Sequence, residues 1–331
     1  MKIAIIGGGF SGIGIAYALY QQPVPCEVTL IDPNGIGGEA SKMSTGLLHP
    51  YVGLKAKLNP YGLEGYAKTV EMVRTAEKAL QKPVILSKGI LRIAISDEQA
   101  YYYKEASSLY KDVKWLSADE VIKIDPHLPY RPAILIETGL SLDVENYILG
   151  MEKQLFSRGL LLEKRTISSL EECSGYDLIF LATGAIPFPG INQIKMHQVK
   201  GQLIELALPE GCAPLPFSLM GEVYMTMHPS SGSVIVGATY EHTFHSPKPE
   251  PAFAMNELLP KAFTLYPPLK NAPILNVRAG LRASTPSRLP FAGKIQEKCY
   301  ALVGMGSRGM LYHGYFAEKL VNEVLSNASR S

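Results

Sequence analysis

The sequence predicts an α/β fold (α+β overall) in which a discontinuous Rossmann-like dinucleotide-binding domain carries an inserted domain of antiparallel β-sheet and helices. Residues 2–32 have the order strand, glycine-rich turn, helix, strand. Residues 201–237 alternate between apolar and polar side chains, as antiparallel strands do. Residues 299–325 repeat the order strand, glycine-rich turn, helix. Both ends of the chain are therefore expected to return to one sheet.

The first unit has the pattern of a dinucleotide-binding fingerprint. Lys2–Ile6 and Glu27–Ile31 are short apolar runs typical of buried parallel strands, and Ile13–Tyr20 is predicted as the helix between them. Three glycines with the spacing GxGxxG lie in the turn, and an acidic residue follows the second strand. Together these features indicate a nucleotide site more specifically than a glycine-rich loop alone.

Four residues of this unit have physical roles toward a dinucleotide. Gly7 permits a tight turn, Gly9 lets the backbone approach a pyrophosphate, and Gly12 lets the helix pack closely on the strands. The helix N-terminus offers N–H groups and a partial positive charge to phosphate oxygens. Asp32 is expected to accept hydrogen bonds from the ribose hydroxyls of the adenosine. The sequence thus predicts that the chain binds a dinucleotide.

The composition is that of an ordinary globular protein. Of the 331 residues, 47% are hydrophobic and 19% are charged, and the formal net charge is +2. This mildly basic balance neither requires nor excludes a nucleic-acid partner. The four cysteines are far apart and form no CxxC pair, which disfavours a metal site or a redox dithiol and predicts reduced thiols in the cytoplasm. No apolar run is long enough to predict a membrane span.

The next segments extend the nucleotide fold. A loop of small and hydroxyl residues at Glu39–Gly46 suits either close approach to a cofactor or an ordinary solvated surface. Ala182-Thr183-Gly184 is a small-residue turn that leaves room for a ligand after a parallel strand. Helices are predicted at 61–80, 97–110, 117–124 and 143–158, and strands at 89–95, 133–137, 160–163 and 176–181.

The second half changes to antiparallel patterns. Strands are expected at 201–206, 222–227 and 233–237, and the turn Ser230-Ser231-Gly232 is expected to join the last two as a hairpin. A helix is predicted near Phe253–Phe263. This order predicts a dinucleotide-binding domain of residues 1–85, 141–198 and 276–331, and a substrate domain of residues 86–140 and 199–275.

As a set, these motifs resemble the D-amino-acid-oxidase-like family of FAD-dependent oxidoreductases, which includes glycine oxidase and sarcosine oxidase. The resemblance covers nearly the whole chain. Within the family, the closing motifs are most similar to the flavin domain of the bifunctional enzyme that forms 5-methylaminomethyl-2-thiouridine in tRNA. Two positions depart from the family pattern, Ser287 where an acid is frequent and Val144 where a proline is frequent. The resemblance rests on the first glycine turn with Asp32 and on motifs at 40–46, 182–184, 199–202, 236–239, 278–293 and 304–310.

The resemblance implies FAD as the cofactor and an enzyme that oxidises the C–N bond of an amine or amino-acid-like substrate. In this family a hydride moves from the carbon beside the nitrogen to flavin N5, the imine hydrolyses, and oxygen reoxidises the flavin. The residues expected to contact FAD are Gly7, Gly9, Phe10, Ser11, Gly12, Asp32, Ala40, Ser41, Ser44, Thr45, Gly46, His49, Ala182, Thr183, Gly184, Gly304, Gly306, Ser307, Arg308, Gly309 and Met310.

Three residues are predicted to act on the substrate. Relatives similar to glycine oxidase place a carboxylate clamp at the position of Arg282, so Arg282 is expected to bind a carboxylate bidentately. Arg308 is expected to donate to the flavin or to a second substrate group. Tyr224 lies in the β layer expected to cover the flavin and is predicted to hydrogen-bond the substrate; Tyr240 is a second candidate for that role.

The substrate class stays open between two possibilities. One is a small amine or amino acid, such as glycine, sarcosine or a proline-like amine. The alternative is the wobble uridine of a tRNA, from which a carboxymethyl group is removed oxidatively. A pyridine-nucleotide–flavin reductase is less favoured because a second GxGxxG unit is missing, and a non-catalytic flavoprotein is less favoured because of Arg282. No membrane partner is predicted, and the oligomeric state stays open. A tRNA enzyme is expected to have a basic rim. Two interpretations stay open for five basic residues, that they form such a rim or that they belong to an ordinary solvated surface: Lys55, Lys57, Arg288, Lys294 and Arg308.

Overall fold

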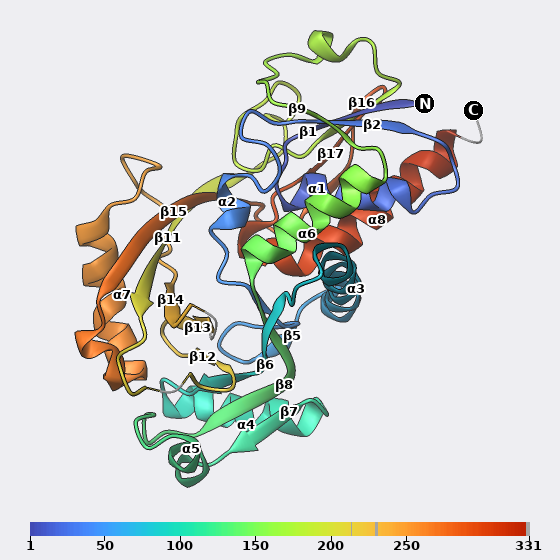
Figure 1. The fold of residues 1–331 in the computed structure, drawn as a ribbon. Coiled ribbons are helices and arrows are strands. Elements are labelled where there is room, and N and C mark those ends of the chain that lie inside the picture. Colours follow the sequence, from blue (N-terminus) through green and yellow to red (C-terminus); the bar gives the residue numbers. More distant parts are fainter. Residues whose placement is uncertain (213, 229–230, 329–331) are drawn as a thin grey trace.

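A six-stranded sheet forms the part of the fold where the sequence predicts a dinucleotide site (Figure 1). The computed structural model describes residues 1–212, 214–228 and 231–328. The parallel strands that the sequence predicts near residues 2, 27, 161 and 178 are confirmed. The runs near residues 2, 27 and 178 are buried along most of their length, whereas the edge strand near residue 161 is partly exposed. In spatial order the strands are β16 (Phe291–Gln296), β17 (Cys299–Val303), β10 (Leu178–Leu181), β1 (Lys2–Ile6), β2 (Glu27–Ile31) and β9 (Leu161–Glu163).

Two of these strands come from the C-terminal part of the chain. β17 pairs in parallel with β10, so the sheet is built from discontinuous segments as expected. The edge strand β16 runs antiparallel to β17 and was not expected from the sequence. The carboxyl ends of β1, β10 and β17 therefore meet at one edge of the sheet, where ligands bind in open α/β folds.

Four helices cover one face of this sheet: α1 (Phe10–Tyr20), α3 (Gly62–Leu80), α6 (Val144–Ser157) and α8 (Gly309–Ala328). α1 is buried on nearly all sides because it lies between the sheet and α8. The segments before and after β10 cover the opposite face of the sheet, where Cys173 of η1 (Leu170–Cys173) and the loop residues Phe188 and Ile191 pack against Ala4 and Ile6. None of the helices in the described residues combines the length and apolar character that a bilayer crossing requires.

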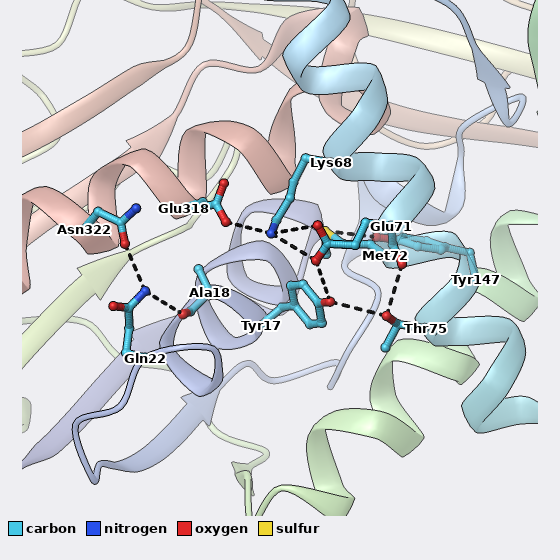
Figure 2. Close-up of polar contacts among 10 residues, drawn as sticks. All are labelled: Tyr17, Ala18, Gln22, Lys68, Glu71, Met72, Thr75, Tyr147, Glu318 and Asn322. Carbon is cyan, nitrogen blue, oxygen red and sulfur yellow. Dashed lines mark hydrogen bonds and ion pairs between the residues drawn. The ribbon is translucent and has the colours of Figure 1, made fainter.

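A polar network ties α1, α3 and α8 together (Figure 2). The side chain of Lys68 is only 10% exposed, and its Nζ lies 2.7 Å from Glu318 and 3.0 Å from Glu71. The hydroxyl of Tyr17 donates to Glu71 over 2.9 Å and approaches Thr75 at 3.3 Å. Because each polar end has a partner, these long side chains lie between the helices without an unpaired charge.

A second sheet contains nine strands and lies beside the first (Figure 1). Its strands include β15 (Ile274–Ser284), β11 (His197–Ala207), β14 (Ser233–Gly237), β13 (Tyr224–His228), β12 (Ser218–Met220), β6 (Ile85–Ile93), β8 (Ala133–Leu142) and β3 (Leu47–Leu48), in that order; β7 (Val113–Leu116) pairs with β8. β15 belongs to this sheet, although the sequence groups residues 276–331 with the dinucleotide-binding domain.

Helices cover both faces of the nine-stranded sheet. Leu91 and Ile93 point to the face that carries α5 (Ala118–Ile124) and α7 (Pro251–Leu265). Ile90 points to the opposite face, which carries α4 (Asp97–Leu109) and the small sheet of β4 (Tyr51–Val52) and β5 (Lys57–Leu58). β13 and β14 pair as the predicted hairpin strands, whereas Ser230 of the predicted turn lies outside the described residues.

Candidate active site

A cavity of about 430 Å³ lies where the two sheets meet. Its wall combines segments that follow β1, β10 and β17 with residues of β11, β13 and β15. The predicted cofactor residues that line it are Gly9, Phe10, Ser11, Ala40, Ser41, Ser44, Thr45, Ala182, Gly184, Gly304, Gly306, Ser307, Gly309 and Met310; the predicted substrate residues that line it are Tyr224, Tyr240 and Arg282.

The first glycine turn is shaped by close backbone packing. Gly7 has φ +111°, and a Cβ there would lie 2.7 Å from the carbonyl carbon of Ala182. A Cβ on Gly12 would overlap the carbonyl oxygen of Gly7. Both positions therefore exclude side chains, as the fingerprint predicts, although neither residue itself lines the cavity.

The N-terminus of α1 opens toward the cavity. The first N–H groups of a helix have no partner inside the helix, and Gly9, Phe10 and Ser11 all line the wall. The N–H of Phe10 donates to Ser41 Oγ over 2.9 Å. The Ser41 hydroxyl hydrogen remains free to bond to a ligand. This end of the cavity suits a negatively charged group such as a diphosphate.

Asp32 lies beside the glycine turn but does not line the cavity. Its two carboxylate oxygens accept hydrogen bonds of 2.8 Å from the N–H groups of Gly8 and Asn34. Each oxygen keeps a free lone pair, so these bonds leave the carboxylate able to accept further donors. The expected role of Asp32 toward a ribose stays a prediction.

The loop that carries α2 (Glu39–Lys42) is anchored to the nine-stranded sheet. The hydroxyl of Thr226 in β13 donates to the carbonyl oxygen of Thr45 over 2.9 Å. Gly46 has φ +77°, and a Cβ there would overlap the carbonyl oxygen of Leu142, so the loop turns closely over β8. This packing favours cofactor approach over a solvated loop, although Gly46 itself stays outside the cavity wall.

Three predicted site residues have other neighbours. The Thr183 hydroxyl donates to the carbonyl oxygen of Ile186 over 3.1 Å. Arg308 donates to the carbonyl oxygen of Arg288 over 3.2 Å. Burial, reinforced by the positive charge of Arg92, lowers the pKa of His49 to about 3. None of Thr183, Arg308 and His49 lines the cavity, so their contacts with cofactor or substrate stay predictions.

Arg282 places a guanidinium in the cavity wall. It lies on β15 opposite Val199, and its Cζ is 5.9 Å from the centre of the Tyr240 ring. Burial lowers the pKa of the guanidinium, and Tyr224, Tyr240 and Glu241 act in the opposite direction. No ion pair within the described residues reaches it. A partly buried cation that has no ion-pair partner among the described residues is an attractive binding point for an anion.

Several lining residues were not predicted from the sequence. The exposed Glu222 lies in the cavity wall together with Arg282, so the wall contains charges of both signs. Its position two residues before Tyr224 in an alternating strand pattern is the signal that places both on one face. The apolar part of the wall is completed by Met43, Leu203, Ala238, Leu281, Ala283 and Met305.

Curated proteins of similar sequence cover most of this chain. Glycine oxidase of Bacillus licheniformis is 24% identical over 359 residues, which cover 98% of this chain and 92% of that protein. The tRNA 5-methylaminomethyl-2-thiouridine biosynthesis bifunctional protein MnmC of Leptospira interrogans is 24% identical over 317 residues, which cover 88% of this chain and 48% of that protein. The chain thus spans about half the length of this bifunctional relative.

The fold is also found among solved structures. Glycine oxidase from Geobacillus kaustophilus superimposes with a TM-score of 0.84 at 19% identity, over 98% of this chain and 95% of that structure. The family model described as FAD dependent oxidoreductase matches residues 2–323. This match spans both sheets and every segment of the cavity wall. The chain therefore belongs to the family of FAD-dependent oxidoreductases.

Proposed function

We propose that this oxidoreductase binds FAD in the cavity and oxidises the C–N bond of an amine whose carboxylate binds to Arg282. The observation that carries the proposal is the unpaired guanidinium of Arg282 in the same wall as the open N-terminus of α1. One cavity thus contains a place for a diphosphate and a place for a carboxylate.

The residues present fit FAD. Gly9, Gly304 and Gly306 line the cavity with backbone rather than side chains, so that a large planar or phosphorylated group can approach closely. Gly304 and Gly306 have φ +78° and +56°, and they lead directly into α8. Two helix N-termini therefore face one cavity, and both favour negative charge.

The chain's own residues bind and orient the substrate. When bound, FAD supplies the acceptor for a hydride from the carbon beside the amine nitrogen. Arg282 holds the carboxylate, which fixes the orientation of that carbon. Tyr224 and Tyr240 place hydroxyl groups at the same wall, where they donate to the carboxylate or accept from the amine. Apolar neighbours such as Leu203 and Leu281 exclude water from the reacting carbon.

A visible spectrum of the purified protein tests the proposal first. We expect bound flavin that is bleached anaerobically by glycine, sarcosine, proline or a D-amino acid. Bleaching by a carboxylate-bearing amine but not by the corresponding amine without the carboxylate would support the role of Arg282. A protein that neither contains nor takes up FAD would contradict the proposal.

A second candidate substrate is a modified uridine in tRNA. It is favoured by the similarity to the bifunctional tRNA-modifying relative over most of this chain. Its carboxymethylamino group has the same secondary amine and carboxylate as sarcosine, so Arg282 has the same role. A tRNA enzyme should bind unmodified tRNA with an affinity that falls steeply with salt. Bleaching by tRNA carrying the carboxymethylaminomethyl group, without bleaching by free amino acids, would select this alternative.

A further inference from the structure

We propose that Gly201 positions the substrate-binding arginine, because its missing side chain leaves the space in which the Arg282 guanidinium lies. This inference rests on the proposed function, since Gly201 acts here through the carboxylate that Arg282 binds. It assigns specificity for carboxylate-bearing amines to a residue that does not itself line the cavity.

The strand register brings the two residues together. Gly201 of β11 lies opposite Gly280 of β15, and Val199 lies opposite Arg282. Residues two apart in a strand project from the same face, so the Arg282 side chain starts on the face where Gly201 has none. A Cβ on Gly201 would lie 2.5 Å from Cζ and 3.1 Å from Nε of Arg282, and it would overlap Nη2.

The backbone at this point cannot move away to make room. The neighbouring Lys200 exchanges two hydrogen bonds with Glu241, of 3.0 Å and 2.9 Å. Its Nζ is fully buried and lies 2.6 Å from Glu250. β11 is also paired with β15 on its other side. A side chain at position 201 must therefore displace the guanidinium rather than the strand.

The paired glycine has a different neighbour. A Cβ on Gly280 would lie 3.1 Å from Met43 and 3.3 Å from Ala40, both in the loop that lines the proposed cofactor site. Gly280 therefore admits the cofactor loop, whereas Gly201 admits the guanidinium. Gly280→Ala should therefore weaken cofactor binding, whereas Gly201→Ala should weaken carboxylate binding. Different outcomes for the two variants would distinguish a local effect on Arg282 from a general disturbance of the sheet.

The test compares Gly201→Ala with wild type in the FAD-loaded protein. Acetate serves as an inert carboxylate probe, and its Kd is measured by calorimetry; KM and kcat are measured with sarcosine. We expect Kd and KM to rise about 10- to 100-fold, the range for losing charge-assisted hydrogen bonds. The FAD absorbance should not change. Gly139→Ala in β8 is the matched control, since the atoms nearest to a Cβ there belong to Ile90 and Ile136, neither of which lines the cavity, and its acetate Kd should stay at the wild-type value.

A double-mutant cycle with Arg282→Ala decides between a direct and an indirect effect. If Gly201 acts through Arg282, Gly201→Ala should not raise the Kd of acetate any further once the arginine is removed. If Gly201→Ala alone fails to fold, the double variant should fold again, because the crowding side chain is gone. The inference would be overturned if Gly201→Ala bound acetate with the wild-type affinity. It would also be overturned if Gly201→Ala weakened acetate binding by the same factor in the presence and in the absence of Arg282. Acetate binding that does not depend on Arg282 would overturn the proposed function itself.

Discussion

The carboxylate of Asp32 accepts a hydrogen bond of 2.8 Å from the backbone N–H of Gly8, in the middle of the first glycine turn. This bond links the end of β2 to the turn after β1, so the acidic residue is held beside the place proposed for the diphosphate. Asp32 therefore has a structural role in addition to the predicted bonds to a ribose.

Asp32→Asn should weaken FAD binding about 10- to 100-fold, because the amide is neutral and has a single accepting oxygen, so that one of the N–H groups of Gly8 and Asn34 loses its acceptor. The Kd of FAD for the apoprotein, measured by fluorescence quenching, checks this. Asp177→Asn is the matched control: its carboxylate also accepts from a backbone N–H, that of Lys2, but at the opposite end of the sheet. Equal FAD affinities in wild type and Asp32→Asn would contradict the prediction.

Arg282→Ala should raise KM for sarcosine about 10- to 100-fold and leave the flavin spectrum intact, because the charge-assisted bonds to the carboxylate are lost. Arg282→Lys should restore little, since an ammonium group lacks the planar fork. Steady-state kinetics measure both. Arg278→Ala serves as the control, because Arg278 lies on the same strand but pairs with Glu205 at 3.7 Å. Unchanged turnover in Arg282→Ala would remove this residue from the site.

Glu222→Gln should improve the use of substrates with a second carboxylate. A single negative charge in the cavity wall repels such a group, and exposure to solvent limits the effect to about 3- to 10-fold. The ratio of kcat/KM for iminodiacetate to that for sarcosine is the measurement, and the effect should shrink as salt is added. The surface variant Glu210→Gln should leave this ratio unchanged. A ratio unaffected by Glu222→Gln would place this carboxylate out of reach of the substrate.

Acid should destabilise the fold through His313, whose pKa is lowered from 6.5 to about 4, chiefly by burial. Its Nδ1 lies 3.0 Å from the carbonyl oxygen of Gly309, so we infer that Nδ1 carries the hydrogen and that Nε2 accepts from the Tyr147 hydroxyl over 2.5 Å. As the pH falls, His313 takes up a proton in the unfolded state before it does so in the folded state. The stability that comes from burying the neutral imidazole is therefore complete above pH 6.5 and is lost as the pH falls toward 4. The loss should reach about 3 kcal/mol.

Urea unfolding of wild type and His313→Gln at several pH values checks this pH dependence. The stability difference between the two proteins should be largest near pH 7 and should narrow toward pH 4. A difference that stays constant over this range would contradict the assignment to His313.

Lys68→Met should lower the free energy of unfolding by about 1–3 kcal/mol, because Glu71 of α3 and Glu318 of α8 lose the partner that they share. Thermal or urea unfolding measures this loss. Lys261→Met removes an exposed pair with Glu257 and should cost less than about 0.5 kcal/mol. Equal losses in the two variants would show that the network in Figure 2 adds no more than a surface pair.

Local features of the sequence predicted the nucleotide-binding part of the fold well. The turn from Gly7 to Gly12 connects adjacent elements, so its spacing alone determines its geometry. The antiparallel strands near 201–237 were predictable because apolar and polar residues alternate. The edge strand β16 was not, since its residues 293–296 have no strong apolar pattern and Lys294 and Gln296 are exposed.

The remaining features depend on contacts between distant residues. Gly201 and Gly280 are neighbours only through the pairing of β11 with β15, which no local pattern specifies. His49 follows the cofactor loop in sequence, yet its strongest charged neighbour is Arg92 of β6. Arg308 lies in a glycine turn, yet it donates to the carbonyl oxygen of Arg288. Such tertiary contacts, rather than the spacing of a motif, determine where a loop side chain points.

The cavity wall joins residues 9–11 to residues 304–307, 309 and 310, which lie far apart in the sequence. Both segments must be in place before the pocket exists, so a partly folded chain that has ordered only one of them has no complete binding site for the cofactor. Uptake of the cofactor should therefore report that these distant parts of the fold have come together.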